Sequence, residues 1–262
     1  MAESRSYFTH LECSSGCGAG PFDPREFHFL CPGCKLPMLA RYDLRAARAW
    51  KKESLAGRAP NMWRYRELMP LLPGDEPVTL GEGFPPLVHA KRLGATLGIE
   101  RLLIKDESLN PTNSFKARGL SAAISRAKAL GAETVFLPTA GNAGNAAAAY
   151  AAAAGMKCEV FIPKDAKQPF IDECRVYGAN VTLVDGLITD AGRVATETAK
   201  PRGWYEVATF REAGRAEGKK TMGYELAEQL DWTLPDWIIY PTGGGTGMVG
   251  MWKAFAEMEA IG

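Results

Sequence analysis

Strand patterns alternate with helical patterns along the second half of the chain, and this alternation constrains the fold more than any other feature. β-Branched and aromatic runs predict strands at residues 134–138, 158–163, 180–184 and 204–208. Helical segments separate them, namely an alanine-rich stretch that ends at residue 154 and segments at 168–177 and 190–200. Strands joined by helices of this length pair in parallel, and the helices cover both faces of the sheet. The pattern predicts an α/β fold with open, parallel-rich sheets.

The composition is that of a soluble globular protein, and it excludes some partners. The chain has 262 residues and a net charge of +1, with 46% hydrophobic and 23% charged residues. This balance provides no basic surface, so neither nucleic acid nor an anionic membrane is expected as a partner. No apolar run is long enough for a membrane span, and the polar N-terminus lacks the apolar region of a signal peptide. We therefore expect a cytoplasmic protein, whose six cysteines are thiols or metal ligands rather than disulfides.

Four cysteines lie close together near the N-terminus. They form a C-x3-C pair and a C-P-G-C pair with thirteen residues between the pairs: Cys13, Cys17, Cys31 and Cys34. Two close pairs on glycine-containing turns are typical of a tetrahedral thiolate zinc site, although the first pair is one residue wider than the common form. A segment of about forty residues buries too little surface to fold alone, and a metal would hold its two turns together. The spacing predicts a structural Zn²⁺; a ribbon with free thiols, packed on the main domain, is the alternative.

Other potential metal ligands receive no such role. His10 and His28 lie near the cysteines and are interpreted as surface or packing residues. Cys158 and Cys174 lie in segments with apolar patterns and are interpreted as inert core thiols.

One lysine is placed at the predicted start of a helix. An apolar strand at 101–104 leads through turn residues to Ser114, which caps a helix that opens at Phe115 and continues to residue 130. Lys116 then lies in the first turn, where the helix dipole disfavours a cation. This position, next to Phe115, is expected to lower the pKa of the amine and make it nucleophilic. A solvated surface lysine is the alternative, and by residue type it is the more common case.

A glycine-rich loop near the end of the chain has the pattern of a phosphate site. An apolar strand at 236–241 leads into Thr-Gly-Gly-Gly-Thr-Gly at 242–247, and a helix begins near Met248. Backbone N–H groups of such a loop cradle a phosphate, and Thr246 adds a hydroxyl. The loop matches neither a Walker A motif nor a dinucleotide fingerprint. A glycine-rich turn without a ligand is the alternative.

A second loop of small residues, at 139–145, follows the predicted strand at 134–138. It lies at the C-terminal end of a strand and the N-terminus of a helix, where open α/β sheets bind ligands. Exposed N–H groups there favour a carboxylate or a phosphate, and small side chains admit a ligand close to the main chain. A tight turn that needs small residues for packing is the alternative, and the pattern does not separate the two.

These segments also resemble a known enzyme family. Ser-Phe-Lys-Ala-Arg-Gly at 114–119 resembles the Schiff-base segment of the pyridoxal-phosphate (PLP) enzymes of the tryptophan-synthase-β fold type, and it is most similar to that of threonine synthases. The resemblance implies that Lys116 binds PLP covalently beside Phe115, and that Asn142 forms a hydrogen bond with the ring hydroxyl oxygen. It also implies that the glycine loop binds the phosphate of PLP, through Gly243, Gly244, Gly245, Thr246 and Gly247. The loop that would hold the α-carboxylate of the substrate comprises Thr139, Ala140, Gly141, Asn142 and Ala143.

Two further segments extend the resemblance. Arg-Ala-Glu-Gly-Lys-Lys-Thr at 215–221 resembles a segment of the family and implies that Arg215 binds the phosphate of the substrate, because a guanidinium matches phosphate oxygens. Lys219 is a weaker candidate for that role, and a solvated charge run is the alternative. The segment at 81–87 resembles the family's Gly-Glu-Gly-x-Thr-Pro-Leu element, although Pro85 replaces the Thr. Asn113 stands where the family usually has Gly, and Asn tolerates a left-handed backbone better than most residues.

The resemblance implies an activity, and two alternatives stay open. Threonine synthases convert O-phospho-L-homoserine and water to L-threonine and phosphate, with PLP as the electron sink and a lysine that moves protons as base and acid. A homodimer is implied as well. A serine/threonine dehydratase-like PLP lyase shares the lysine and both loops but needs no second phosphate site. A catalytically incomplete fragment that serves as a binding or assembly module is the other alternative.

The resemblance runs from residue 11 to residue 261, whereas members of the family continue well beyond this point. The missing part would carry further strands and the Ser or Thr that contacts the pyridine nitrogen. We therefore expect the N-terminal part of an enzyme, with a cysteine ribbon at 1–45, an incomplete cofactor-binding lobe at 46–125 and 205–262, and a smaller α/β lobe at 126–204. A helix is expected at 44–56, and the open end would leave a sheet edge unpaired.

Overall fold

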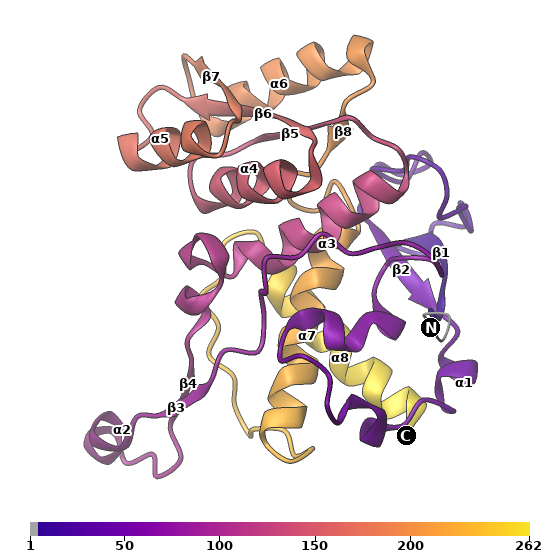
Figure 1. The fold of residues 1–262 in the computed structure, drawn as a ribbon, viewed down its shortest axis with the longest axis vertical. Coiled ribbons are helices and arrows are strands. Elements are labelled where there is room, and N and C mark those ends of the chain that lie inside the picture. Colours follow the sequence, from indigo (N-terminus) through magenta and orange to yellow (C-terminus); the bar gives the residue numbers. More distant parts are fainter. Residues whose placement is uncertain (1–4) are drawn as a thin grey trace.

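A four-stranded parallel sheet occupies one end of the molecule (Figure 1). The computed structural model describes residues 5–262. The strand order is β7-β6-β5-β8, with β5 at Thr134–Pro138, β6 at Lys157–Pro163, β7 at Asn180–Val184 and β8 at Tyr205–Glu206. Each strand is parallel to its neighbours. The predicted α/β fold with a parallel sheet is confirmed, and β8 extends this sheet just past residue 204, where we placed the end of the smaller lobe.

Helices cover both faces of this sheet. Successive strand residues point to opposite sides, and apolar side chains on each side pack against helices. Val135 and Leu137 belong to a core that they share with α4 (Asn142–Ala154) and α5 (Gln168–Val176). Phe136 packs with α6 (Ile188–Ala199) in a separate core on the other face. Figure 1 shows α6 on one side of the sheet and α4 on the other.

Three helices pack together below the sheet in Figure 1: α3 (Lys116–Ala129), α7 (Gly214–Gln229) and α8 (Thr246–Ile261). Glycines allow them to approach closely. A Cβ on Gly218 would lie 2.0 Å from the carbonyl oxygen of Arg118, and a Cβ on Gly250 would lie 2.8 Å from the backbone nitrogen of Lys220. Neither position has room for a side chain, so α7 is held against both α3 and α8 at short range.

An N-terminal hairpin of β1 (Phe8–Cys13) and β2 (Met38–Tyr42) lies beside α7 and α8. Its buried side chains share one core with Tyr224 of α7 and Ala254 of α8. This shared core fixes the hairpin on the same two helices that carry residues 215 and 246.

The segment that follows the hairpin differs from its prediction. The structure has α1 at Leu44–Ala47 and 3-10 helices at Lys52–Leu55 and Met62–Leu68. The single helix predicted at 44–56 is wrong, because Lys51 is extended, with φ −111° and ψ 144°. Ala47 and Leu55 both enter the hairpin core, and such packing outweighs helix propensity in a short segment.

The strand predicted at 236–241 is also wrong. Trp237 and Ile239 are 89% and 94% exposed, and none of the strands within residues 5–262 pairs with this segment. An extended apolar segment forms a strand only when a neighbour shares its backbone hydrogen bonds.

The strand predicted at 101–104 is confirmed with a shift. It is β4 (Leu103–Lys105), antiparallel to β3 (Leu87–His89), and α2 (Lys91–Leu97) completes this arm at the side of the molecule (Figure 1). In the described part of the chain, none of the helices combines the length and the apolar character that crossing a membrane requires.

Candidate active site

The turn that leads into α3 carries Lys116. Two short 3-10 helices, Glu107–Leu109 and Pro111–Asn113, connect β4 to this turn. Asn113 has a φ of 51°, so it adopts the left-handed conformation that its side chain tolerates. The helix begins at Lys116, one residue later than predicted. Ser114 Oγ accepts a hydrogen bond of 3.0 Å from the Lys116 backbone N–H, as expected of a capping residue.

The amine of Lys116 is half-buried. Its Nζ lies 3.6 Å from the centroid of the Phe115 ring. Burial and, second, the nearby guanidinium of Arg215 lower the pKa of Lys116 to about 8, because both disfavour an ammonium ion. The predicted lowering is confirmed, but Arg215 is a cause that the sequence did not indicate. At pH 7 about a tenth of such amines would be neutral, against roughly 0.03% for an ordinary lysine.

Two cations of α7 join Lys116 to form what we term the cation cluster: Lys116, Arg215 and Lys219. Arg215 is fully buried, and its Nη1 donates to the carbonyl oxygen of Val207. Its Nε and Nη2 have no hydrogen-bond partner among the described residues. Lys219 Nζ donates a hydrogen bond of 2.6 Å to Thr246 Oγ1. Three clustered basic side chains, of which Arg215 has unpaired donors, attract an anion, and a planar guanidinium suits phosphate or carboxylate.

Burial is also the main cause of the lowered pKa values of Lys219 and Arg215 on α7. The pKa of Lys219 lies well below its usual value because of burial and, second, because of Arg215 and Lys116. Burial lowers the pKa of Arg215 to about 10, although Glu212 opposes the shift. This segment is therefore not the solvated charge run that was the alternative for Arg215. Lys219, the weaker candidate for the substrate phosphate, contacts Thr246 at the end of the glycine loop.

The glycine loop caps the N-terminus of α8. Gly245 precedes the helix with a φ of 80°, a conformation that favours glycine. A Cβ on Gly247 would lie 2.1 Å from the hydroxyl oxygen of Tyr240, so that position has no room for a side chain, whereas a Cβ on Gly243 would meet nothing within 4 Å. The first N–H groups of α8 have no partner within the helix. They lie next to Thr246, whose hydroxyl contacts Lys219, and this combination suits a phosphate.

The loop at 139–145 lies at the end of β5, as predicted, and α4 begins at Asn142. A Cβ on Gly144 would lie 2.7 Å from Thr139 Cγ2, so packing does require a small residue there. The side chain of Asn142 is exposed. Helix α4 packs against the Pro111–Asn113 turn that precedes Lys116. The loop at 139–145 is thus a neighbour of the turn that carries Lys116. It contributes no residue to the cation cluster, whose members lie on α3 and α7.

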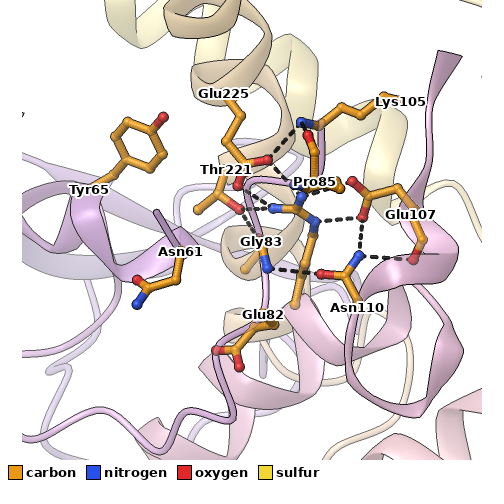
Figure 2. Close-up of polar contacts among 12 residues, drawn as sticks. Asn61, Tyr65, Glu82, Gly83, Pro85, Lys105, Glu107, Asn110, Thr221 and Glu225 are labelled. Carbon is orange, nitrogen blue, oxygen red and sulfur yellow. Dashed lines mark hydrogen bonds and ion pairs between the residues drawn. The ribbon is translucent and has the colours of Figure 1, made fainter. Parts of the chain in front are cut away.

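A buried arginine two residues after Lys116 joins the turn before α3 to α7, and Figure 2 labels its partners Glu107, Thr221 and Glu225. Arg118 is completely buried. Its Nε and Nη2 donate to Glu107 at 2.6 and 2.8 Å. Its Nη1 and Nη2 donate to Glu225 of α7 at 2.6 and 2.7 Å. Lys105 Nζ also lies 2.9 Å from Glu225, so two cations and two carboxylates balance each other.

This network fixes the lysine turn from both sides. Asn110 Nδ2 donates to Glu107 at 2.9 Å, and its Oδ1 accepts from the backbone N–H of Gly83 at 2.8 Å (Figure 2). Burial alone would raise the pKa of Glu225, but Arg118 and then Lys105 hold it below its usual value. Sequence reasoning missed the network, although the two charged residues 105 and 107 at the end of an apolar strand were a signal.

The protein thus has an α/β fold in which a lysine of lowered pKa lies beside donor groups that suit a phosphate. Residues 78–261 match the family of pyridoxal-phosphate dependent enzymes, and the chain belongs to this family. The threonine synthase of Methanocaldococcus jannaschii is 36% identical over 212 residues, which are 80% of this chain and 52% of that protein. The threonine synthase of Methanosarcina acetivorans is 33% identical over 254 residues, or 97% of this chain and 61% of that protein.

Solved structures agree on the fold. Diaminopropionate ammonia lyase from Escherichia coli superimposes with a TM-score of 0.64 at 22% identity, covering 69% of this chain and 57% of that one. Threonine deaminase isoform 2 from Solanum lycopersicum gives a TM-score of 0.59 at 27% identity, with 66% and 47% coverage. The chain thus spans about half to three-fifths of the length of these proteins.

Proposed function

We propose that this chain carries the lysine-bearing part of a PLP-dependent threonine synthase, which converts O-phospho-L-homoserine and water to L-threonine and phosphate. The threonine synthases at 36% and 33% identity support this choice. The observation that carries the proposal is the cation cluster, where unpaired donors of Arg215 lie near Lys116. A cofactor and a substrate that each bear a phosphate need two anion sites, and the α8 N-terminus and Arg215 can serve as the two.

The residues of the site fit PLP. Its aldehyde requires a neutral amine, and the lowered pKa of Lys116 favours one. Its phosphate requires N–H donors and a balancing cation, which the glycine loop and Lys219 offer beside Thr246. Lys116 would therefore hold the cofactor covalently, and Asn142 would bind its ring hydroxyl oxygen. When bound, PLP supplies the electron sink for carbanion chemistry.

The remaining roles fall to the chain's own side chains. The amine of Lys116 would move protons at Cα and Cβ of the substrate, because a pKa of about 8 lets it act as base and acid near neutral pH. Arg215 would bind the phosphate of the substrate and stabilise the charge of the departing phosphate. The loop at 139–143 would hold the α-carboxylate through its backbone N–H groups.

A serine/threonine dehydratase-like lyase is the second candidate, because the tomato threonine deaminase shares the fold at 27% identity. Such an enzyme would not need Arg215 for a substrate phosphate. A catalytically incomplete binding or assembly module is the third, because the chain spans only 52% and 61% of the two threonine synthases.

Assays of the purified chain with added PLP separate the three. The proposal expects release of phosphate and formation of threonine from O-phosphohomoserine, and no keto acid from serine or threonine. Arg215→Met should reduce kcat/KM for phosphohomoserine at least tenfold, which corresponds to about 1.4 kcal/mol of transition-state binding, whereas Lys116→Ala should abolish turnover. Keto acid from serine or threonine would support the lyase. Turnover of neither substrate would support the module. A homodimer belongs to the same proposal, and sedimentation equilibrium tests it.

A further inference from the structure

The thiols of the N-terminal hairpin converge on one point. The Sγ atoms of Cys13, Cys17, Cys31 and Cys34, which we term the thiol cluster, all lie within 4.8 Å of one another. Cys13 and Cys34 are 3.3 Å apart, and Cys17 and Cys31 are 3.5 Å apart. Four sulfurs that bind one zinc ion at about 2.3 Å lie about 3.8 Å from each other. The two short separations lie slightly below this value, and no pair of the four sulfurs is more than 4.8 Å apart, so one ion can reach all four.

Local backbone geometry creates this convergence. Cys13 ends β1, and a turn with Gly16 at φ 63° brings Cys17 back toward it. The second turn begins at Cys31 and closes where the backbone N–H of Lys35 donates to the Cys31 carbonyl oxygen at 2.8 Å. Lys35 has a φ of 63°, a strained value for a residue with a side chain. Two tight turns that each present a pair of thiols are the arrangement of a zinc ribbon.

Neither disulfides nor packing explains the cluster. All six cysteines are free thiols, and the cluster members range from fully buried Cys31 to exposed Cys17. Thiols that served only as small apolar side chains would not converge from two turns while one of them faces water. Ser15 Oγ lies 3.2 Å from Cys13 Sγ and 3.6 Å from Cys34 Sγ, which supplies the outer hydrogen bonds that metal-bound thiolates usually have. Neither His10 nor His28 belongs to the group.

We propose that the thiol cluster binds one Zn²⁺ ion as four thiolates, and that this ion fastens the hairpin onto the helix pair α7–α8. Four protein ligands complete a tetrahedron and leave no position for a substrate, so the role is structural. Each ligand releases its proton to solvent as the metal binds. A cluster of soft sulfur ligands selects zinc over magnesium or calcium.

The connection to the helix pair runs through β2. The hydroxyl of Tyr42 donates to Glu217 of α7 at 2.8 Å. Lys220 Nζ of α7 lies 3.9 Å from the centroid of the Tyr42 ring, and Lys253 Nζ of α8 lies 4.5 Å from it. Glu217 also pairs with Lys220 at 2.6 Å and with Lys253 at 3.1 Å. Tyr42 thus contacts a buried group of charged residues on the two helices, namely Glu217, Lys220 and Lys253. The metal would hold the hairpin that carries Tyr42.

Metal analysis of the purified full chain tests the proposal. Inductively coupled plasma mass spectrometry should find close to one zinc per chain after dialysis against metal-free buffer. Cys17→Ser should lose this zinc, because it removes a ligand at an exposed position. The matched control Cys158→Ala, at a buried thiol outside the cluster, should keep it. Cobalt in place of zinc should give the visible bands of a tetrahedral thiolate site in the wild type and the control only.

Hydrogen exchange then tests the fastening role. Removal of zinc with a chelator should increase exchange in β1, β2 and the contact surface of α7 and α8, while the sheet strands β5 and β6 stay protected. This readout does not depend on PLP or on any substrate. Zinc below about a tenth per chain with four reactive thiols in the folded protein, iron in place of zinc, or zinc retained by Cys17→Ser would overturn the site. Unchanged exchange in α7 and α8 would overturn the fastening role.

Discussion

Arg118 offers a sharp test of how the lysine turn is held. The variant Arg118→Met keeps most of the apolar stem but removes all five hydrogen bonds of the guanidinium. It leaves Lys105 to balance both Glu107 and Glu225, so the local charge becomes 1 − 2 = −1 in a buried region. Breaking a buried pair from one side costs about 3–5 kcal/mol. For a chain of this size the Tm should fall by about 6–20 °C.

Urea unfolding at pH 7 measures the loss, and two controls interpret it. Arg193→Met removes an exposed pair with Glu197 and should cost less than about 1 kcal/mol. The double variant Arg118→Met/Glu107→Gln restores charge balance, because Lys105 and Glu225 then pair alone. It should recover part of the stability. A cost for Arg118→Met no larger than that of Arg193→Met would refute the reasoning.

The pH dependence of the same variant has a definite sign. In the wild type the pKa of Glu225 is lowered. Its contribution to the free energy of unfolding is therefore present at neutral pH and is lost as the pH falls through its folded pKa. Without Arg118, burial dominates and the folded pKa rises above the unfolded value, so the protonated form is favoured. The difference in unfolding free energy between wild type and variant should therefore shrink between pH 7 and pH 5.

Three further outcomes are expected. Because the pKa of Lys116 is about 8, its modification by an amine-specific reagent, followed by peptide mass spectrometry, should rise with a midpoint near pH 8. Gly218→Ala should lower the free energy of unfolding in urea by about 1–3 kcal/mol, since its Cβ would lie 2.0 Å from the Arg118 carbonyl oxygen. In helix α6 a Cβ on Gly192 would make only an ordinary contact of 3.8 Å with Pro138, so Gly192→Ala should raise the free energy of unfolding by up to about 1 kcal/mol. Tyr42→Phe should cost about 1.5–3 kcal/mol by removing its hydrogen bond to Glu217.

Each of these outcomes has a clear opposite. A Lys116 midpoint near that of the other lysines would mean that neither burial nor Arg215 acts on the amine. Equal effects of alanine at Gly218 and Gly192 would contradict the close contact of α3 and α7. An unchanged stability of Tyr42→Phe would show that the hairpin does not close the charge group.

The alternation of strand and helix patterns predicted the parallel sheet because each element was marked by its own short apolar run. The same reasoning failed at 236–241, where the apolar pattern of Trp237 and Ile239 is real but no strand pairs with it in residues 5–262. Pairing is a property of two segments, and a local pattern describes only one. The helix predicted at 44–56 failed for a related reason, because the buried positions of Ala47 and Leu55 are set by contacts with the hairpin.

The candidate site was predictable where a motif is local. Lys116, its capping Ser114 and the glycine loop were each readable from neighbouring residues. The burial of Arg215 was not, since the charged sequence at 215–221 has the appearance of a solvated surface. The Arg118 network was also missed, because Glu107, Arg118 and Glu225 come from three separate segments that only the packing of α3 on α7 brings together.

Covalent trapping of the cofactor tests the central claim most directly. The purified chain would be incubated with PLP, reduced with borohydride and digested, and the labelled peptide would be located by mass spectrometry. The account predicts one pyridoxyl group per chain on Lys116, absent in Lys116→Ala. Labelling on Lys219 or Lys105 instead, or scattered labelling that Lys116→Ala leaves unchanged, would contradict it.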